Sequence, residues 1–317
     1  PETFDDLIAL IALFRPGPLQ SGMVDDYIDR KHGKKKVNYP HPQVEEILLP
    51  TYGVIIYQEQ VMQIAQVLAG YTLGAADVLR RAMGKKKPDE MELQRAVFVD
   101  GAEKRGVKLR TANSIFDLME KFAGYGFNKS HSAAYAMLSF QTAWLKTHFP
   151  SDFMAAALSA DMEHTDKIVI LIDECRKLKI EILPPDINVS EYEFSVDEEF
   201  RIRYGLGAVK GVGKRAVENI ISEREDGKYF SGLYDFCFRI DSQKCNKRAC
   251  EALITSGAFD TVGAHRAEIL AELPNAMSTA DQHVSAKSSG QDDMFGLENN
   301  TNASRSKSKD PPWSERR

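Results

Sequence analysis

The chain has 317 residues, which corresponds to about two domains at roughly 150 residues per domain. Its 43 % hydrophobic content suffices for packed cores, and 41 Lys and Arg against 46 Asp and Glu give a formal net charge of −5. A protein that is basic throughout is therefore excluded, and any nucleic-acid surface must come from local clustering of cations.

Membrane insertion, secretion and a cysteine scaffold are also disfavoured by the sequence. The longest wholly apolar run, Leu7 to Phe14, is much shorter than the ~20 residues of a membrane helix. No basic segment with a cleavage site precedes it, and the four cysteines include no Cys-x-x-Cys pair. We expect a soluble, cytoplasmic protein without a membrane partner or a metal-ligand set.

Helical patterns dominate residues 1–183. Thr3 and Asp6 have capping-box spacing, which predicts a helix through Leu7 to Phe14 that ends at the RPGP run of residues 15–18. Asp166 to Leu178 is a further amphipathic candidate. Two more apolar stripes have helical spacing, and we interpret both as core faces: Val61, Ile64, Ala65 and Leu68, with Gly70 at the C-cap position, and Met137, Phe140 and Trp144, ended by Pro150.

Composition changes at two points after residue 183. Pro184-Pro185 marks the first boundary, and the alternation of apolar and polar residues from Tyr192 to Tyr204 predicts a short β-hairpin. Residues 205–273 are helical in pattern, and the polar stretch after Pro274 is predicted to be a linker or tail. The fold class is therefore mainly α, with domains at 1–183 and 184–274 and a flexible tail at 275–317.

Two polar segments of the first domain could hold an anion. Residues 80–87 contain five cations, beginning with Arg80 and Arg81, and residues 125–132 read YGFNKSHS. Adjacent arginines can fork onto phosphate oxygens, and phosphoryl transfer depends on fixed positive groups of this kind. From composition alone, a basic cluster of this kind is more often a solvated face.

The stretch VKGVGKRAVENII at 209–221 has the pattern of a helix-hairpin-helix DNA-binding motif. Gly211 and Gly213 let the backbone turn and approach a phosphate, while the helix that follows offers unpaired N–H groups. Lys210, Lys214 and Arg215 add positive charge. Such a site would hold DNA through its backbone, without regard to sequence.

Two other glycine motifs fail at specific positions. A Walker loop would need Gly at 208 and Ser or Thr at 215, where the chain has Ala208 and Arg215. A Rossmann fingerprint starting at Gly205 would need Gly at 210, where the chain has Lys210. An ordinary glycine-rich turn between helices stays open.

The polar tail contains one short apolar motif. Gln291, Asp292, Asp293, Met294 and Phe295 form the sequence QDDMF, in which an apolar pair follows a leading glutamine. Such a peptide in a polar segment can dock in a pocket of a partner protein, although five residues are weak support on their own.

Taken together and in this order, these stretches resemble the alpha subunit of bacterial DNA polymerase III, the C-family of replicative polymerases. The resemblance runs from the first residue to the last. Its fingers-like motifs are FRPGPLQSGMV at 14–24, YQEQVMQIAQ at 57–66, LRRAMGKKKP at 79–88 and FAGYGFNKSHSAAYA at 122–136. The tandem helix-hairpin-helix region is matched by ILPPDIN at 182–188, YGLGAVKGVG at 204–213 and SGAFD at 256–260, and the internal clamp-binding motif by GQDDMFG at 290–296.

The resemblance implies roles for particular residues. Arg80 and Arg81 would contact the triphosphate of the incoming dNTP, and Asn128, Lys129, Ser130 and His131 would line the same pocket. The glycines and cations of 210–215 would grip the primer-template duplex. The QDDMF motif would bind the beta sliding clamp, and the other holoenzyme subunits would bind through regions outside this chain.

The resemblance also has a gap. The family holds its Mg²⁺ ions with palm-domain aspartates that include an Asp-x-Asp pair, and this chain contains no Asp-x-Asp. We therefore expect no catalytic residue in the chain and no polymerisation by it alone, whereas the full-length subunit would be a DNA-directed DNA polymerase. The alternative function is a stand-alone DNA-binding, clamp-associated accessory protein, which would not need the pocket of Arg80 and Lys129.

Overall fold

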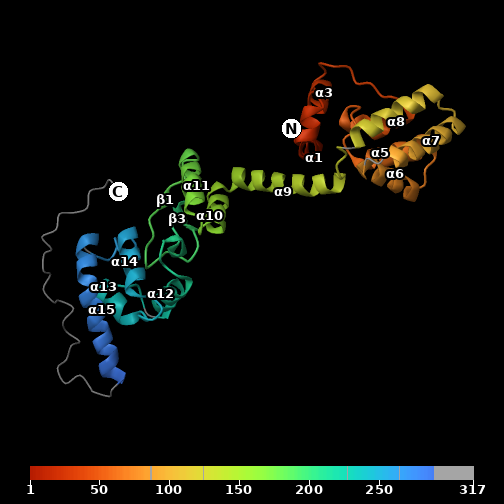
Figure 1. Cartoon of the computed structure of the whole chain (residues 1–317). Coiled ribbons are helices and arrows are strands. Elements are labelled where there is room, and N and C mark those ends of the chain that lie inside the picture. Colours follow the sequence, from red (N-terminus) through yellow and green to blue (C-terminus); the bar gives the residue numbers. More distant parts are fainter. Residues whose placement is uncertain (86–87, 124, 227, 264, 289–317) are drawn as a thin grey trace. The chain divides into compact units, whose positions relative to one another are not determined.

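The computed structural model describes residues 1–85, 88–123, 125–226, 228–263 and 265–288 (Figure 1). Packing divides the chain into two compact units, residues 1–143 and 144–317, and the division falls inside helix α9 (Lys129–His148). The structure confirms the predicted mainly helical fold with one small sheet. Within the described ranges, no helix combines the length and the apolarity needed to cross a membrane. The domain boundary predicted at Pro184-Pro185 differs from this packing division and stays a prediction.

Helices build the first unit around two cores. One core lies among α5 to α8, where Leu68, Phe98 and Phe116 are fully buried. The other joins α1 and α3 to Val54, Ile56 and Tyr57 and to Ala136 of α9. The helices of this unit before α9 are α1 (Phe4–Leu13), α2 (Pro16–Gln20), α3 (Met23–Lys31), α4 (Glu45–Leu48), α5 (Gln58–Ala69), α6 (Leu73–Lys85), α7 (Pro88–Lys104) and α8 (Leu109–Ala123).

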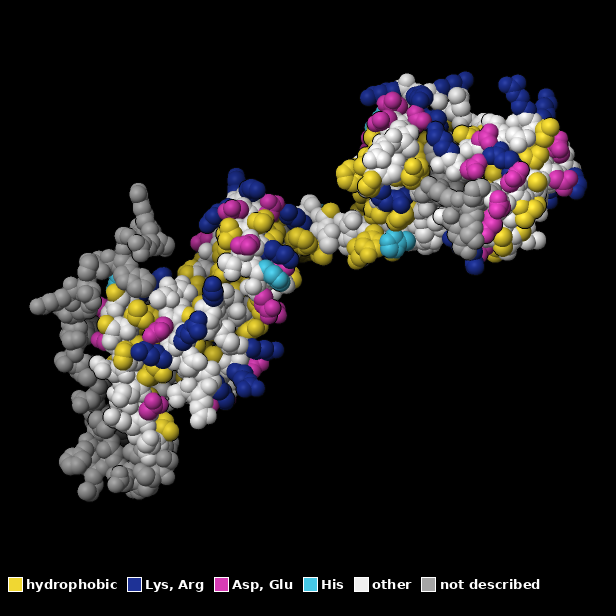
Figure 2. Space-filling view, viewed as in Figure 1, with side chains coloured by type: hydrophobic (Ala, Val, Ile, Leu, Met, Phe, Trp, Pro, Cys, Tyr) yellow, Lys and Arg dark blue, Asp and Glu magenta, His cyan; other side chains and the backbone are white. Residues whose placement is uncertain are grey.

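The two apolar stripes expected to be core faces have different outcomes. The stripe of α5 is buried, and Gly70 ends the helix with a φ of +72°, as predicted. The stripe of α9 is not a core face: Met137, Phe140 and Trp144 are 46 %, 48 % and 45 % exposed. Apolar side chains are visible on α9 in Figure 2. The prediction was wrong because α9 continues from one unit into the next, and the side chains it packs into a core, such as Ala136, lie near its start.

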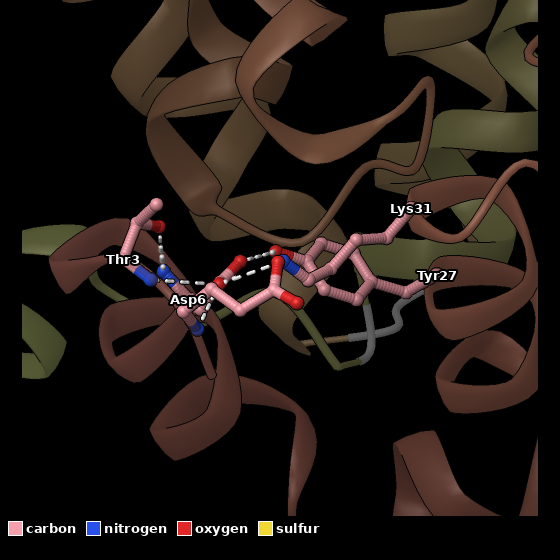
Figure 3. Close-up of polar contacts among 5 residues, drawn as sticks. Thr3, Asp6, Tyr27 and Lys31 are labelled. Carbon is pink, nitrogen blue, oxygen red and sulfur yellow. Dashed lines mark hydrogen bonds and ion pairs between the residues drawn. The ribbon is translucent and has the colours of Figure 1, made fainter.

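The capping box that predicts α1 also joins this helix to α3 (Figure 3). The carboxylate of Asp6 accepts hydrogen bonds from the backbone N–H groups of Glu2 and Thr3, at 2.7 and 3.0 Å. It also accepts a bond from Lys31 Nζ at 2.8 Å and one from the Tyr27 hydroxyl at 3.4 Å. Asp6 is 6 % exposed, so an N-terminal cap and a nearly buried ion pair use the same carboxylate.

The second unit has a small sheet and two cores. The predicted hairpin is present as β2 and β3, whose antiparallel pairing sets Val196 opposite Ile202, and β1 adds a parallel strand to β3. One core lies beside this sheet, and the other lies among the later helices. The elements are α10 (Pro150–Ala160), α11 (Thr165–Lys177), β1 (Ile182–Leu183), β2 (Ser195–Val196), β3 (Ile202–Arg203), α12 (Lys214–Asp226), α13 (Leu233–Arg239), α14 (Lys247–Ser256) and α15 (Arg266–Ser288).

The helix α15 extends further than the sequence predicts. The tail was expected from residue 275, yet α15 continues through Pro274 to Ser288. Leu273, Ala276 and Ala280 are buried at helical spacing, and α15 packs on α13 and α14. This burial outweighs the one hydrogen bond that a proline removes from a helix interior.

Candidate functional site

The first candidate site is built where the start of α5 meets the segment before α9. The N–H of Phe127 donates to the carbonyl of Ile56 at 3.1 Å, and the N–H of Gln58 donates to the carbonyl of Phe127 at 2.9 Å. These bonds make an isolated parallel bridge between Tyr57 and Phe127. The Asn128–His131 segment is thereby fixed beside the first turn of α5.

Gln58 connects this segment to the basic helix α6. Its side-chain amide donates to the carbonyl of Gly126 at 3.1 Å, and its amide oxygen accepts a bond from Arg80 Nη1 at 3.3 Å. Arg80 is thus one side chain away from the backbone that leads into α9. The structure brings Arg80 and the 126–129 segment together, although they are about forty-five residues apart in the sequence.

An aspartate holds both arginines. Asp77 Oδ1 accepts a bond from Arg80 Nη2 at 2.7 Å, and Asp77 Oδ2 lies 2.7 Å from Arg81 Nη2. The hydrogen bond from Arg80, together with the charges of both arginines, lowers the pKa of Asp77. The side chain of Arg81 is 66 % exposed, against 32 % for Arg80. Arg81 therefore faces solvent, and Arg80 is held in a defined position.

A second carboxylate occupies the N-terminus of α9. Glu59 accepts hydrogen bonds from the N–H of Lys129 through both oxygens, each at 3.1 Å, and from the side-chain amide of Asn128 at 3.1 Å. Asn128 in turn caps the helix, because its Oδ1 accepts the N–H of His131 at 2.8 Å. A helix N-terminus favours an anion, and in this structure the anion is a side chain of the protein itself.

The remaining predicted residues lie around this helix start. Lys129 Nζ lies 5.5 Å from the centre of the Tyr57 ring, and burial raises the pKa of that tyrosine. The His131 ring packs between those of Phe127 and Tyr135. Ser130 is exposed in the first turn of α9. The residues that position this cluster, Gln58, Glu59 and Asp77, were missed by the sequence reasoning, although the QEQ run at a helix start was a visible signal.

The second candidate site is the loop that precedes α12. Gly211 has a φ of +96°, a conformation that L side chains rarely adopt, so this position requires glycine. The carbonyl of Gly213 accepts the N–H groups of Ala216 and Val217 at 3.0 and 3.3 Å, which makes Gly213 the start of α12. A Cβ added at Gly213 would meet no atom within 4 Å, so the surface there is open to a ligand.

Exposed cations surround this helix start. Lys210, Lys214 and Arg215 are all exposed. Lys214 lies 3.9 Å from Glu218, whereas Lys210 and Arg215 form no ion pair with another described residue. The unpaired N–H groups of the first turn and these cations favour the same ligand, an anion.

Two glycines before the loop serve packing instead. A Cβ at Gly205 would lie 2.6 Å from the backbone of Glu193, and one at Gly207 would lie 2.6 Å from the ring of Tyr192. The N–H of Gly207 donates to the carbonyl of Tyr192 at 2.9 Å. The YGLG run therefore seats the chain against residues 191–193, a role that the sequence did not reveal.

The remaining two predictions concern a metal and the clamp motif. Among the residues that the structure describes, no group of three or more His, Cys, Asp or Glu side chains could hold a metal ion. These residues do not fit a Mg²⁺ site, and no catalytic step is assigned to them. The motif Gln291–Phe295 lies outside the described residues.

Two family models match parts of this chain: one covers the Arg80 part of the first candidate site but not Asn128–His131, and the other covers the loop before α12. Residues 1–106 match the family described as bacterial DNA polymerase III alpha subunit finger domain, and residues 179–269 match the helix-hairpin-helix motif. The DNA polymerase III subunit alpha of Vibrio cholerae is 60 % identical over 94 % of this chain, which covers 26 % of that protein. The same subunit of Escherichia coli K12 is 59 % identical over the same shares, and that of Haemophilus influenzae is 56 % identical over the whole chain and 28 % of the relative.

The chain spans about a quarter of the length of these curated relatives. Both family matches fall where the sequence placed fingers and hairpin motifs, in the same order. The chain belongs to the bacterial DNA polymerase III alpha-subunit family, of which it carries the finger-domain and helix-hairpin-helix regions.

Proposed function

We propose that the first unit holds the triphosphate of an incoming dNTP during template-directed DNA synthesis by the longer polymerase. The observation that supports this most is the bridge through Gln58, which joins Arg80 to the segment leading into Lys129. A forked guanidinium, a mobile ammonium and a helix N-terminus then lie within one region, and each favours phosphate oxygens.

The second unit has the complementary task of holding duplex DNA. The open backbone at Gly213, the first turn of α12 and the exposed cations at Lys210, Lys214 and Arg215 suit contacts to backbone phosphates. Binding of this kind is independent of base sequence and weakens as salt is added. The motif at 291–295 would bind the beta sliding clamp. The chain alone is not expected to extend a primer, because the Mg²⁺ ions of the relatives would be held by residues of the longer enzyme.

Replacing Arg80 tests the triphosphate proposal. Arg80→Ala removes a charge-assisted fork worth about 1.5–3 kcal/mol, so the affinity for a dNTP should fall by about tenfold or more in a calorimetric titration. Arg110→Ala is the control, because Arg110 is an exposed arginine on another helix of this unit and forms no ion pair with a described residue. An Arg80→Ala variant that binds the dNTP as tightly as the wild type would remove the triphosphate assignment.

A further inference from the structure

A cavity in the second unit contains three of the four cysteines of the chain. It has a volume of about 450 Å³ and is lined by α13, the segment after α13, α14 and α15. Cys237, Cys245 and Cys250 all lie on its wall, among apolar side chains such as Phe236 and Val284. Neither candidate site described above uses this cavity. The fourth cysteine, Cys175, is buried in the separate core beside the sheet.

Two of these thiols are in direct contact. The Sγ atoms of Cys245 and Cys250 are 3.7 Å apart, a thiol hydrogen-bond distance, and the two residues are 0 % and 2 % exposed. A disulfide needs about 2.05 Å between the sulfurs. The two sulfur atoms would therefore have to move closer by less than one atomic diameter to form a covalent bond. The contact crosses the start of α14, because Asn246 caps that helix and Cys250 lies in its first turns.

The surroundings make the two thiols unequal. The hydrogen bond between the two sulfurs lowers the pKa of Cys245, which also lies directly before Asn246, the N-cap of α14. The same hydrogen bond, together with burial, raises the pKa of Cys250, and burial raises the pKa of Cys237 to about 12. A thiolate is the reactive form of cysteine, and a helix N-terminus stabilises it. Cys245 is therefore the nucleophile of the pair, and Cys250 is placed to react with it next.

We propose that Cys245 and Cys250 form an oxidation site. A small peroxide that enters through the cavity oxidises the two thiols, which then form a disulfide with each other. The Cys245 thiolate attacks one oxygen of hydrogen peroxide, the O–O bond breaks, and the departing hydroxide takes a proton to become water. The resulting sulfenic acid is attacked by the sulfur of Cys250. The S–O bond breaks, the S–S bond forms, and a second water leaves with the Cys250 proton. Two thiols are oxidised and one peroxide is reduced to two waters.

Three observations separate this pair from cysteines that only fill space. The sulfurs touch, the pair spans the start of a helix, and a cavity reaches the residues that carry them. Cys175 has the burial without the other features, since no described thiol lies in contact with it. It therefore serves as the internal control.

Peroxide treatment of the native chain tests the proposal. The full chain is exposed to hydrogen peroxide without denaturant, quenched, unfolded and alkylated, and the alkylated thiols are counted by intact mass. We expect two thiols to be lost, a peptide cross-link that joins Cys245 to Cys250, and recovery of all four thiols after dithiothreitol. Four thiols after treatment, a cross-link through Cys237, or oxidation only in denaturant would each overturn the proposal.

Two variants assign the roles of the sulfurs. Cys250→Ser should leave a sulfenic acid at Cys245 that a dimedone probe labels, whereas Cys175→Ser should form the disulfide at the wild-type rate. Dimedone labelling of Cys237 instead of Cys245 would contradict the assigned nucleophile. The count of thiols in the wild-type chain decides the proposal even if a serine variant fails to fold.

Discussion

Two carboxylates position the positively charged groups of the candidate triphosphate site. Asp77 holds both arginines, and Glu59 holds the N-terminus of α9. An incoming triphosphate would have to compete with these side chains, because it needs the same donors. The carboxylates keep the cations in position before a ligand arrives. Because they occupy the donors that a triphosphate needs, they also lower the net affinity of the site for the triphosphate.

Neutralising Glu59 tests this competition. Glu59→Gln should raise the affinity for a dNTP by about twofold to fivefold, which corresponds to the 0.3–1 kcal/mol typical of a charge at a helix end. The same change should lower the melting temperature without ligand, because α9 loses an anion at its N-terminus. Calorimetry and a thermal melt measure the two effects, and Glu92→Gln, an exposed charge change on α7 beyond its first turn, should show neither. An unchanged or weaker dNTP affinity for Glu59→Gln would show that Glu59 supports the site without competing for it.

Local residue signals predicted some positions well and could not reveal others. The capping box of Thr3 and Asp6 and the C-cap at Gly70 are set by a few neighbouring residues, so the sequence was sufficient. Gln58 and Asp77 matter because of partners in three dimensions, and nothing in their immediate neighbours specifies those partners. The sequence thus located the candidate cations but not the groups that position them.

At the scale of elements, helical periodicity predicts that one face of a helix is apolar. It does not predict whether another element packs on that face. The stripes of α5 and α9 look alike in sequence, yet one is buried and the other is exposed. Conversely, the composition after Pro274 is polar, yet Ala276 and Ala280 are buried and Met277 packs against the core of the later helices, so α15 continues. The hairpin of β2 and β3 was predictable, whereas the parallel strand β1 comes from a separate segment and was not.

The attachment of α1 to α3 should depend on pH. Burial alone would raise the pKa of Asp6, but the hydrogen bonds from Lys31, Glu2 and Thr3 outweigh it and hold that pKa well below its ordinary 3.8. A lowered folded-state pKa means that the stabilisation is complete above the ordinary value and is lost as the pH falls below it. In urea unfolding, the stability advantage of the wild type over Asp6→Asn should shrink between about pH 5 and about pH 2. Asp25→Asn, a change at an exposed aspartate of α3, is the control, and an Asp6 difference that varies with pH no more than the Asp25 difference would contradict the assignment.

The loop before α12 separates backbone conformation from ligand access. Gly211→Ala places a side chain at a φ of +96° and should cost about 1–3 kcal/mol of unfolding free energy. Gly213→Ala should cost less stability but should weaken DNA binding more, because its methyl group enters the open space where a phosphate would approach. Urea unfolding and fluorescence anisotropy with duplex DNA at two salt concentrations measure the two quantities. DNA affinities that simply follow stability in both variants would argue against a phosphate contact at Gly213.

At the scale of the whole molecule, binding sites that are weak on their own retain DNA more strongly when one chain carries them together. A net charge of −5 means that DNA is not attracted to the surface in general, so retention depends on local cations and on tethering. A clamp bound at residues 291–295 would hold the hairpin loop near the same duplex at a high effective concentration. The same logic applies to the first unit, whose triphosphate contacts would operate only while DNA is held.

The clamp motif gives the last prediction. Met294→Ala with Phe295→Ala should abolish binding to the beta sliding clamp, because buried anchors of this type contribute about 2 kcal/mol or more each. The double variant should bind free duplex DNA as the wild type does, yet it should lose the extra retention that a loaded clamp provides. Surface plasmon resonance on DNA with and without the loaded clamp separates the two effects, and Leu297→Ala, an apolar change just outside the motif, is the matched control. Equal retention of the double variant and the control on clamp-loaded DNA would show that tethering does not use this motif.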